Sequence, residues 1–425
     1  MQEELFFFLG KLAFWLLLRF NSIKSLLFVA LCLLLSILSK ETGVVFIVMV
    51  GLYLLWFDRK RLLPFIGIMT IPITVYMVLR VNAVGFFAGM HSAPIDELSL
   101  PRRLATVPAI IAFYLYIFVS PIKLARAYYW TYPSFSFHHT LLPLAIDLAI
   151  LFLVIYLGCA LYKKLPKDQF LIFVFFATWV VVGFLVHIQV TPLDMTACDT
   201  WLYFSMLGLL GVMGILIAVF LPRSINPYIL FAIAMVLIGG LAFRSAIRGT
   251  DYSDWLKITL LDIKASKENY VAYNNLAAND LDHGDLNQAK IYAELSVASY
   301  HTLSGYENLG RTSSRLGDYK GALDAYKEAL SIKGDKQQYE KELYEKIGNL
   351  SIFAGNYSDK QVMLEAIKEY PTDSLLWMYL AILEDKYNDN AAAKISIQKA
   401  VNYGSVDQTL YNAIMSNQSF NLKMN

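Results

Sequence analysis

The sequence predicts an all-α protein in two parts: a polytopic transmembrane helix bundle over residues 1–248 and a soluble stack of helix pairs over residues 249–425. Three observations support this prediction. Of the 425 residues, 57% are hydrophobic and 16% are charged, whereas soluble domains hold about 25% charged residues. Long apolar segments fill the first part of the chain. A helical repeat fills the second part.

Charge also separates the two parts. Residues 1–248 hold 18 Lys and Arg against 10 Asp and Glu, and residues 249–425 hold 18 against 24. The net charge of +2 therefore combines a basic membrane part with an acidic soluble part. Neither part is typical of nucleic-acid binding. The three cysteines, Cys32, Cys159 and Cys198, have no disulfide or metal-ligand spacing, so we expect no metal site, and the sequence identifies no cofactor.

A transmembrane helix needs about 20 mostly apolar residues. About nine segments of the first part fit this description, at residues 5–20, 24–39, 42–57, 62–80, 105–122, 141–162, 169–188, 201–220 and 227–244. The first segment follows an acidic start and carries Lys11, which is not typical of a cleavable signal peptide. The sequence thus predicts an integral membrane protein of a bacterial inner membrane or the endoplasmic reticulum, in contact with membrane lipid.

Basic loops predict the orientation, because Lys and Arg tend to stay on the cytoplasmic side. Placing residues 58–61 and 163–167 inside puts the Lys40-Glu41 turn outside. The loop before residue 201 and the whole soluble part then also lie outside. The two basic loops require an even number of crossings between residues 81 and 140, where one span is clear. A segment there is re-entrant, interfacial or misassigned, and residues 84–90 and 128–132 are candidates for the interface.

Beyond residue 250, four copies of a helical repeat are evident. The clearest copy has large residues at Tyr306, Leu309, Tyr319 and Tyr326, small residues at Gly310, Ala322 and Ala329, and a turn at Gly317. The first aromatic residues of the copies, at 273, 306, 344 and 377, are separated by 33, 38 and 33 residues. This is the tetratricopeptide pattern, which predicts an α-solenoid with a surface for a protein or peptide partner.

Two polar groups at membrane ends are candidate substrate-binding residues. Lys40 and Glu41 join two spans with almost no loop, so both charges lie at the outer interface and can meet a phosphate. They can equally be charged residues that merely cap two helices. Asp199 and Tyr203 stand where a later span begins. A carboxylate beside aromatic rings can bind a sugar, although Asp199 can also cap that helix. Weaker candidates are Asp147, His138, His139, Arg126 and Lys123.

These features together resemble one family. The segment Ser39-Lys40-Glu41-Thr42-Gly43 between two spans, residues 199–205 entering a late span, and the C-terminal repeats resemble the transmembrane-and-tetratricopeptide O-mannosyltransferases. That family belongs to the multi-spanning GT-C class of glycosyltransferases. Asp199, Trp201-Leu202-Tyr203 and Ser205 match its late motif. Thr200 stands in place of the motif's arginine, and the proline before the serine is missing.

The resemblance implies protein O-mannosylation or a related glycosylation. A hexose, mannose or another, would pass from a polyprenyl-phosphate donor to a protein hydroxyl on the extracytoplasmic side. Lys40 would neutralise the leaving phosphate, Glu41 would orient Lys40, and Asp199 with Tyr203 would line the sugar site. The catalytic residue is unknown. GT-C enzymes carry their catalytic carboxylates in a first outer loop, ahead of the Lys-Glu turn.

Only Glu3 and Glu4 precede that turn here, so we expect the chain to lack the N-terminal spans and the usual catalytic base. Whether the chain is an enzyme is therefore uncertain at this stage. It can be part of a longer glycosyltransferase, a partner subunit that completes one, or a noncatalytic membrane-anchored tetratricopeptide scaffold. The scaffold, which would recruit protein partners to the membrane, is the alternative function.

Overall fold

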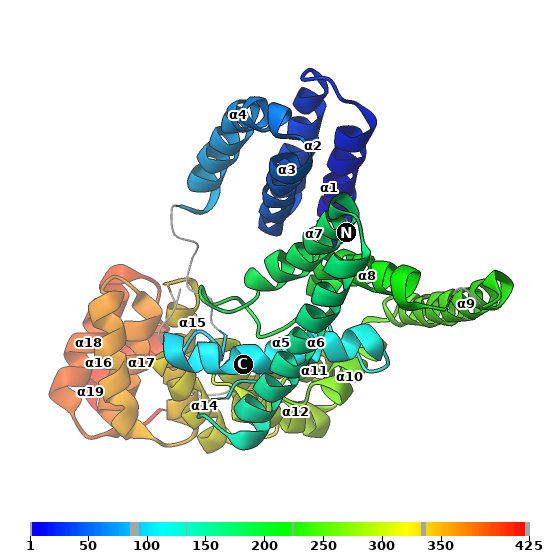
Figure 1. The fold of residues 1–425 in the computed structure, drawn as a ribbon. Coiled ribbons are helices and arrows are strands. Elements are labelled where there is room, and N and C mark those ends of the chain that lie inside the picture. The colour runs from blue at the N-terminus through cyan, green and yellow to red at the C-terminus, as the bar shows by residue number, and fades with distance from the viewer. Residues whose placement is uncertain (1, 86–92, 133, 223–224, 333–336, 421–425) are drawn as a thin grey trace. The chain divides into compact units, whose positions relative to one another are not determined.

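The computed structural model describes residues 2–85, 93–132, 134–222, 225–332 and 337–420 (Figure 1). Within these ranges the regular structure is helical, and the single β-bridge joins Tyr128 to Ala197. The all-α prediction is confirmed. The chain divides into two units, Met1–Glu268 and Asn269–Asn425. The first unit therefore extends beyond residue 248 and includes the short helix α10 (Trp255–Ala265).

Each predicted apolar segment overlaps a helix of the first unit. These helices are α1 (Gln2–Arg19), α2 (Ser25–Ser39), α3 (Val44–Phe57), α4 (Arg59–Val84), α5 (Leu100–Val119), α6 (Leu142–Lys164), α7 (Lys167–Leu185), α8 (Leu202–Phe220) and α9 (Pro227–Asp251). In the described part of the chain, six of them, α4 to α9, are long and apolar enough to cross a membrane. Nine spans are not confirmed, because α2 and α3 are shorter and α1 carries charges at both ends and in its middle.

Aromatic rings join the first helices to α7 and α8. The ring of Phe46 in α3 meets Phe204 of α8 edge-on at 5.0 Å, and Trp179 of α7 stacks on Phe204 at the same separation. Nε1 of Trp179 also donates to the Phe204 carbonyl at 2.9 Å. Gly10 lets α1 approach, since a Cβ there would lie 2.3 Å from the Phe46 ring. This packing brings the start of α1 next to the start of α8.

Helix α5 lies beside the loop of residues 186–198 along much of its length. Near its start, Arg103 donates to the Val190 carbonyl at 3.3 Å. Toward its end, the backbone N–H of Cys198 donates to the Tyr114 hydroxyl at 3.3 Å. A helix of this length is about 30 Å long. Residues of α5 that are 11 positions apart, Arg103 and Tyr114, therefore contact the same loop.

The second unit is a series of helices in which consecutive members pack as hairpins. They are α11 (Tyr270–His283), α12 (Leu286–Ser299), α13 (Leu303–Arg315), α14 (Tyr319–Ser331), α15 (Gln337–Phe353), α16 (Lys360–Glu369), α17 (Ser374–Lys386), α18 (Asn390–Tyr403) and α19 (Gln408–Ser416). The small residues marked by the repeat are packed closely: Ala322 and Ala329 are fully buried, and a Cβ at Gly310 would lie 2.6 Å from the Tyr326 ring.

The turns of the hairpins repeat as well. Gly284 and Gly317 have positive φ values of 85° and 81°, which favour glycine. Each is followed by an aspartate whose side chain accepts a backbone N–H at the start of the next helix, as Asp318 does from Gly321 at 2.9 Å. A Gly-Asp turn thus ends one helix and begins the next.

Candidate functional site

Lys40 meets a carboxylate that the sequence analysis did not select as a site residue. Its side chain, between α2 and the short helix η1 (Glu41–Gly43), forms an ion pair with Glu3 of α1. The Thr200 hydroxyl donates to the same Glu3 oxygen at 3.2 Å. The Lys40 and Glu3 side chains are only 22% and 16% exposed. Three distant segments of the sequence therefore meet at one point, which is largely shielded from solvent.

A second ion pair lies at the same end of the bundle. Asp199 is the first residue of η3 (Asp199–Trp201), and its Oδ2 lies 3.6 Å from a terminal nitrogen of Arg248 in α9. Both side chains are about nine-tenths buried, at 11% and 12% exposure. Removing one partner of such a pair leaves the other as an uncompensated buried charge. We call Glu3, Lys40, Asp199, Thr200 and Arg248 the outer polar cluster, after the side of the membrane that the basic segments of the sequence predict for it.

The other two predicted site residues lie at the margin of this cluster. Glu41 pairs with Arg80 of α4, and its side chain is 66% exposed. The structure thus places Glu3, and not Glu41, at the ammonium of Lys40. Tyr203 is 39% exposed, and its ring lies 6.2 Å from that of Phe7 in α1. Of the predicted residues, Lys40 and Asp199 come together, linked through Thr200 and Glu3.

An aromatic layer covers the cluster on one side. His187 stacks on Trp201 with 4.7 Å between ring centroids and 9° between ring planes. The ammonium of Lys40 lies 6.0 Å from the centroid of the Trp201 ring. Burial, with the positive charge of Lys40, lowers the pKa of His187 to about 3. His187 is therefore a neutral ring at physiological pH, suited to packing and not to proton donation.

Cys198 is an unreactive thiol. Its sulfur donates to the Arg126 carbonyl at 3.0 Å and lies 3.1 Å from the Thr200 hydroxyl. Burial and the nearby Asp199 carboxylate raise the pKa of this thiol to about 11. The nucleophilic form of cysteine is the thiolate. Cys198 consequently stabilises the loop and is not a nucleophile.

Arg126, one of the weaker candidates, has a structural role. Its Nε donates to Asp262 Oδ2 at 2.6 Å, and its backbone N–H donates to Asp262 Oδ1 at 2.9 Å. A second guanidinium nitrogen donates to Thr259 at 3.1 Å. Asp262 is 1% exposed. These bonds attach α10 to the segment that follows α5.

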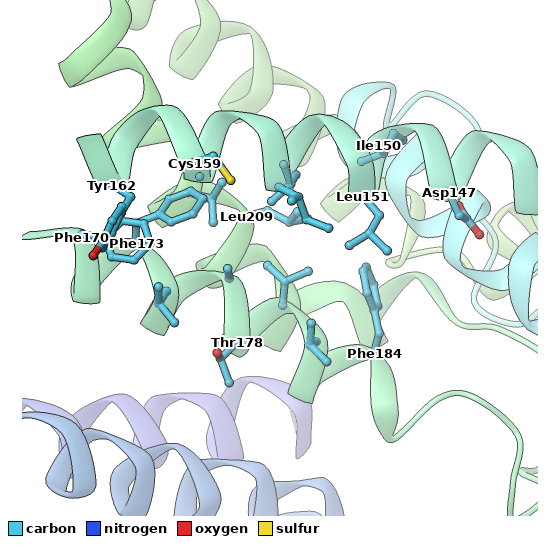
Figure 2. Close-up of a pocket in the computed structure, with 18 of the residues that line it drawn as sticks. Asp147, Ile150, Leu151, Cys159, Tyr162, Phe170, Phe173, Thr178, Phe184 and Leu209 are labelled. Atoms are coloured by element: carbon cyan, nitrogen blue, oxygen red, sulfur yellow. The ribbon is translucent and has the colours of Figure 1, made fainter. Parts of the chain in front are cut away.

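An apolar groove of about 760 Å³ lies elsewhere, lined by α5, α6, α7 and α8 (Figure 2). Leu151, Phe173 and Leu209 are typical of its walls. Asp147 stands at one end, and both of its carboxylate oxygens are buried without a hydrogen-bond partner among the described residues. No residue of the outer polar cluster lines this groove. The groove is predominantly apolar, with Asp147 as the one carboxylate among its lining residues.

Within residues 2–85, 93–132, 134–222, 225–332 and 337–420, no group of three or more His, Cys, Asp and Glu side chains is arranged to hold a metal ion. The acidic groups of the outer polar cluster are instead paired with Lys40 and Arg248. The cluster therefore offers a carboxylate, a cation and a hydroxyl as its chemical groups.

Comparisons with known proteins identify no family. No protein-family model matches the chain. No curated protein matches it either. Among solved structures, the crystal structure of MamA protein is similar at a TM-score of 0.30 and 14% identity, over 42% of this chain and 93% of that one. A likeness at this level carries no argument about function.

Proposed function

We propose that the outer polar cluster is the reaction centre of a membrane glycosyltransferase. It would move a hexose, such as mannose, from a polyprenyl phosphate to a protein hydroxyl. The observation that carries this proposal is the meeting of Glu3 with Lys40 and Thr200, beside Asp199. A carboxylate and a cation within one shielded site are the two groups that this transfer needs. The motif resemblance around Lys40 and Asp199 supports the same function.

In the proposed mechanism, the acceptor oxygen attacks the anomeric carbon of the sugar while Glu3 takes the hydroxyl proton. The bond between that carbon and the phosphate oxygen breaks, and its electron pair stays on the phosphate. Lys40 neutralises the added negative charge. Asp199, held by Arg248, accepts hydrogen bonds from sugar hydroxyls. Glu3 thus takes the role that the family resemblance assigned to a carboxylate outside this chain.

The path of α5 supports an extracytoplasmic site. If the basic loops at residues 58–61 and 163–167 are cytoplasmic, α4 ends outside and α6 must begin outside. This requirement is met when α5 stays at the outer surface beside the loop of residues 186–198. The start of α1, the end of α2, the start of α8 and the end of α9 then lie on the same outer side. These are the elements that supply the outer polar cluster.

The helix hairpins of the second unit favour a scaffold as the second candidate function. We interpret them as tetratricopeptide repeats, because the marked alanines and glycines are at close helix contacts. Such repeats present extended surfaces to peptides or proteins. In the transferase proposal they would hold the acceptor polypeptide. In a noncatalytic protein they would recruit a partner to the membrane without any transfer.

The test is transfer by the purified full chain in lipid vesicles. Mannosyl polyprenyl phosphate and a pool of Ser/Thr peptides are supplied, and mass spectrometry measures hexose on the peptides. We expect transfer by the wild type and a loss of about 100-fold or more with Glu3→Gln. Glu4→Gln, at the exposed neighbouring position, is the matched control and retains activity. If Glu3→Gln transfers hexose as fast as the wild type, Glu3 is not the base. If neither the wild type nor any variant transfers hexose, the transferase proposal is contradicted and the scaffold function is favoured.

A further inference from the structure

A second pocket, of about 390 Å³, lies where α9 ends, between α10 and the segment that follows α5. Four of its lining residues are cationic, namely Lys123, Arg244, Arg248 and Lys264, and one, Asp251, is acidic. We infer that this pocket binds the phosphate or diphosphate group of a ligand. The inference stands on the pocket itself and does not rest on the proposed transferase function.

The single acidic residue offsets only part of the charge of the four cations. Asp251 forms an ion pair at 2.9 Å with Lys257, which does not line the pocket. The Arg244 guanidinium donates to the Ile122 carbonyl at 2.9 Å, a neutral group. Lys123 and Lys264 have no carboxylate partner in the described part of the chain. The pocket therefore concentrates positive charge, and a multivalent anion is the ligand that this charge attracts.

Arg248 indicates where the anion would sit. Its Nε is buried and makes no hydrogen bond with any described residue, and its buried terminal nitrogen Nη2 has only the ion-pair contact with Asp199. The nearest carboxylate, Asp199, is 3.6 Å away, beyond hydrogen-bond range. A buried donor without an acceptor is unfavourable. The guanidinium fork matches the oxygens of a phosphate, so an anion in the pocket would satisfy both nitrogens.

Two sources can supply such a group. The pocket lies at the end of α9, a helix apolar enough to cross a membrane, so the phosphate can belong to a lipid headgroup. It can also belong to a soluble phosphate compound. Cations at a membrane surface commonly attract anionic lipid without forming a pocket. The buried, unsatisfied Arg248 nitrogens distinguish this site from such general attraction.

The experiment measures binding without turnover, using the full chain purified in a phosphate-free neutral detergent. Calorimetry follows inorganic diphosphate. A second arm places the protein in phosphatidylcholine nanodiscs with or without phosphatidic acid and measures retained lipid by native mass spectrometry. We expect the double variant Lys123→Gln/Lys264→Gln to weaken binding by at least about tenfold. Both lysines are exposed, so folding is preserved. Lys267→Gln, an exposed lysine outside the pocket, is the matched control and binds as the wild type does.

The outcomes are distinct. Binding of diphosphate that is lost in the double variant supports a soluble phosphate ligand. Retention of phosphatidic acid alone, lost in the double variant, supports a lipid headgroup. Arg248→Gln should weaken whichever ligand binds, with unchanged helix content by circular dichroism. If the wild type, the double variant and Lys267→Gln bind both probes equally, or bind neither, the pocket is not a phosphate site.

Discussion

The ammonium of Lys40 is paired with the carboxylate of Glu3, 37 positions earlier in the chain, and the Thr200 hydroxyl donates to the same carboxylate. This arrangement changes the interpretation of the Lys40-Glu41 turn. Two adjacent opposite charges between two apolar helices suggest that Lys40 and Glu41 form an ion pair with each other. Instead, Lys40 joins α1 and Glu41 joins α4 through Arg80. The turn between α2 and α3 therefore also links these helices to α1 and α4.

The first prediction concerns this ion pair. Lys40→Met leaves Glu3 as a carboxylate that is only 16% exposed and has lost its cation, so we expect a lower midpoint of thermal unfolding. A double-mutant cycle with Glu3→Gln should give a coupling of about 1 kcal/mol, between the values of exposed and buried pairs. Lys11→Met, at an exposed position of α1, is the control. Additive effects of the two substitutions would mean that the pair makes no contribution.

His187 gives a prediction about pH. Its pKa is lowered to about 3 by burial and by Lys40, whereas an unfolded histidine has a pKa near 6.5. Between these two pKa values, His187 is protonated in the unfolded chain and neutral in the folded chain. Titration of His187 therefore leaves the free energy of unfolding unchanged above about pH 6.5 and lowers it progressively as the pH falls toward about 3. His187→Phe keeps an aromatic ring on Trp201 but cannot titrate, so its unfolding midpoint should fall less steeply with pH than that of the wild type. Identical slopes would contradict this assignment.

The sequence predicted local features well. All nine apolar segments are helices, because hydrophobic runs and their polar breaks are encoded locally. The small positions of the repeat, such as Ala322 and Gly310, are at helix contacts because a 33-residue spacing recurs only if each copy packs alike. The number of spans was less predictable. Apolar length alone does not distinguish a helix that crosses the membrane from one that lies along its surface.

The members of the outer polar cluster were only partly predictable. Lys40 and Asp199 stand out because charges at membrane depth are unusual. Glu3 does not, since an acidic residue in the first turn of a helix is ordinary capping chemistry. Arg248 likewise resembles a basic residue flanking a span. Glu3 and Arg248 are identified as cluster members only by their contacts with residues that are distant in the sequence. A local sequence pattern does not contain such contacts.

The position of α5 can be tested by labelling from one side of the membrane. Leu100→Cys and Val119→Cys place thiols at its two ends, at positions that are 44% and 81% exposed. The native cysteines are first replaced by serine. In sealed vesicles we expect an impermeant maleimide to label both ends from the same side. Lys60→Cys, in the basic first turn of α4, should be labelled only from the other side. Labelling of the two α5 ends from opposite sides would establish α5 as a crossing helix.

Gly10 tests the packing that places Glu3 in the cluster. A Cβ at this position would lie 2.3 Å from the Phe46 ring, so Gly10→Ala forces α1 and α3 apart. We expect destabilisation of about 1–3 kcal/mol from overpacking and, under the transferase proposal, a parallel loss of transfer. Gly51→Ala in α3, where no atom lies within 4 Å of the new Cβ, is the control. It should be neutral or slightly stabilising. Equal effects of the two substitutions would exclude this close contact.

Asp359 tests the packing of the second unit. It is 6% exposed and accepts hydrogen bonds from Lys327 at 2.7 Å, Ser351 at 2.8 Å and Asn356 at 3.0 Å. Asp359→Asn keeps the shape of the side chain but removes the charge, so we expect a loss of about 1.5–3 kcal/mol, the range of hydrogen bonds to charged groups. Hydrogen exchange in the full chain should then accelerate in α15 and α16.

The matched control is Asp318→Asn. Asp318 also pairs with a lysine, Lys290 at 3.2 Å, but its side chain is 45% exposed. Asparagine caps helices about as well as aspartate, so the loss should stay below about 1 kcal/mol, as for exposed ion pairs. If the two substitutions accelerate exchange equally, burial does not distinguish the two aspartates. A larger effect at position 359 would show that Asp359 links neighbouring hairpins from the interior, because Lys327 belongs to α14 and Ser351 belongs to α15.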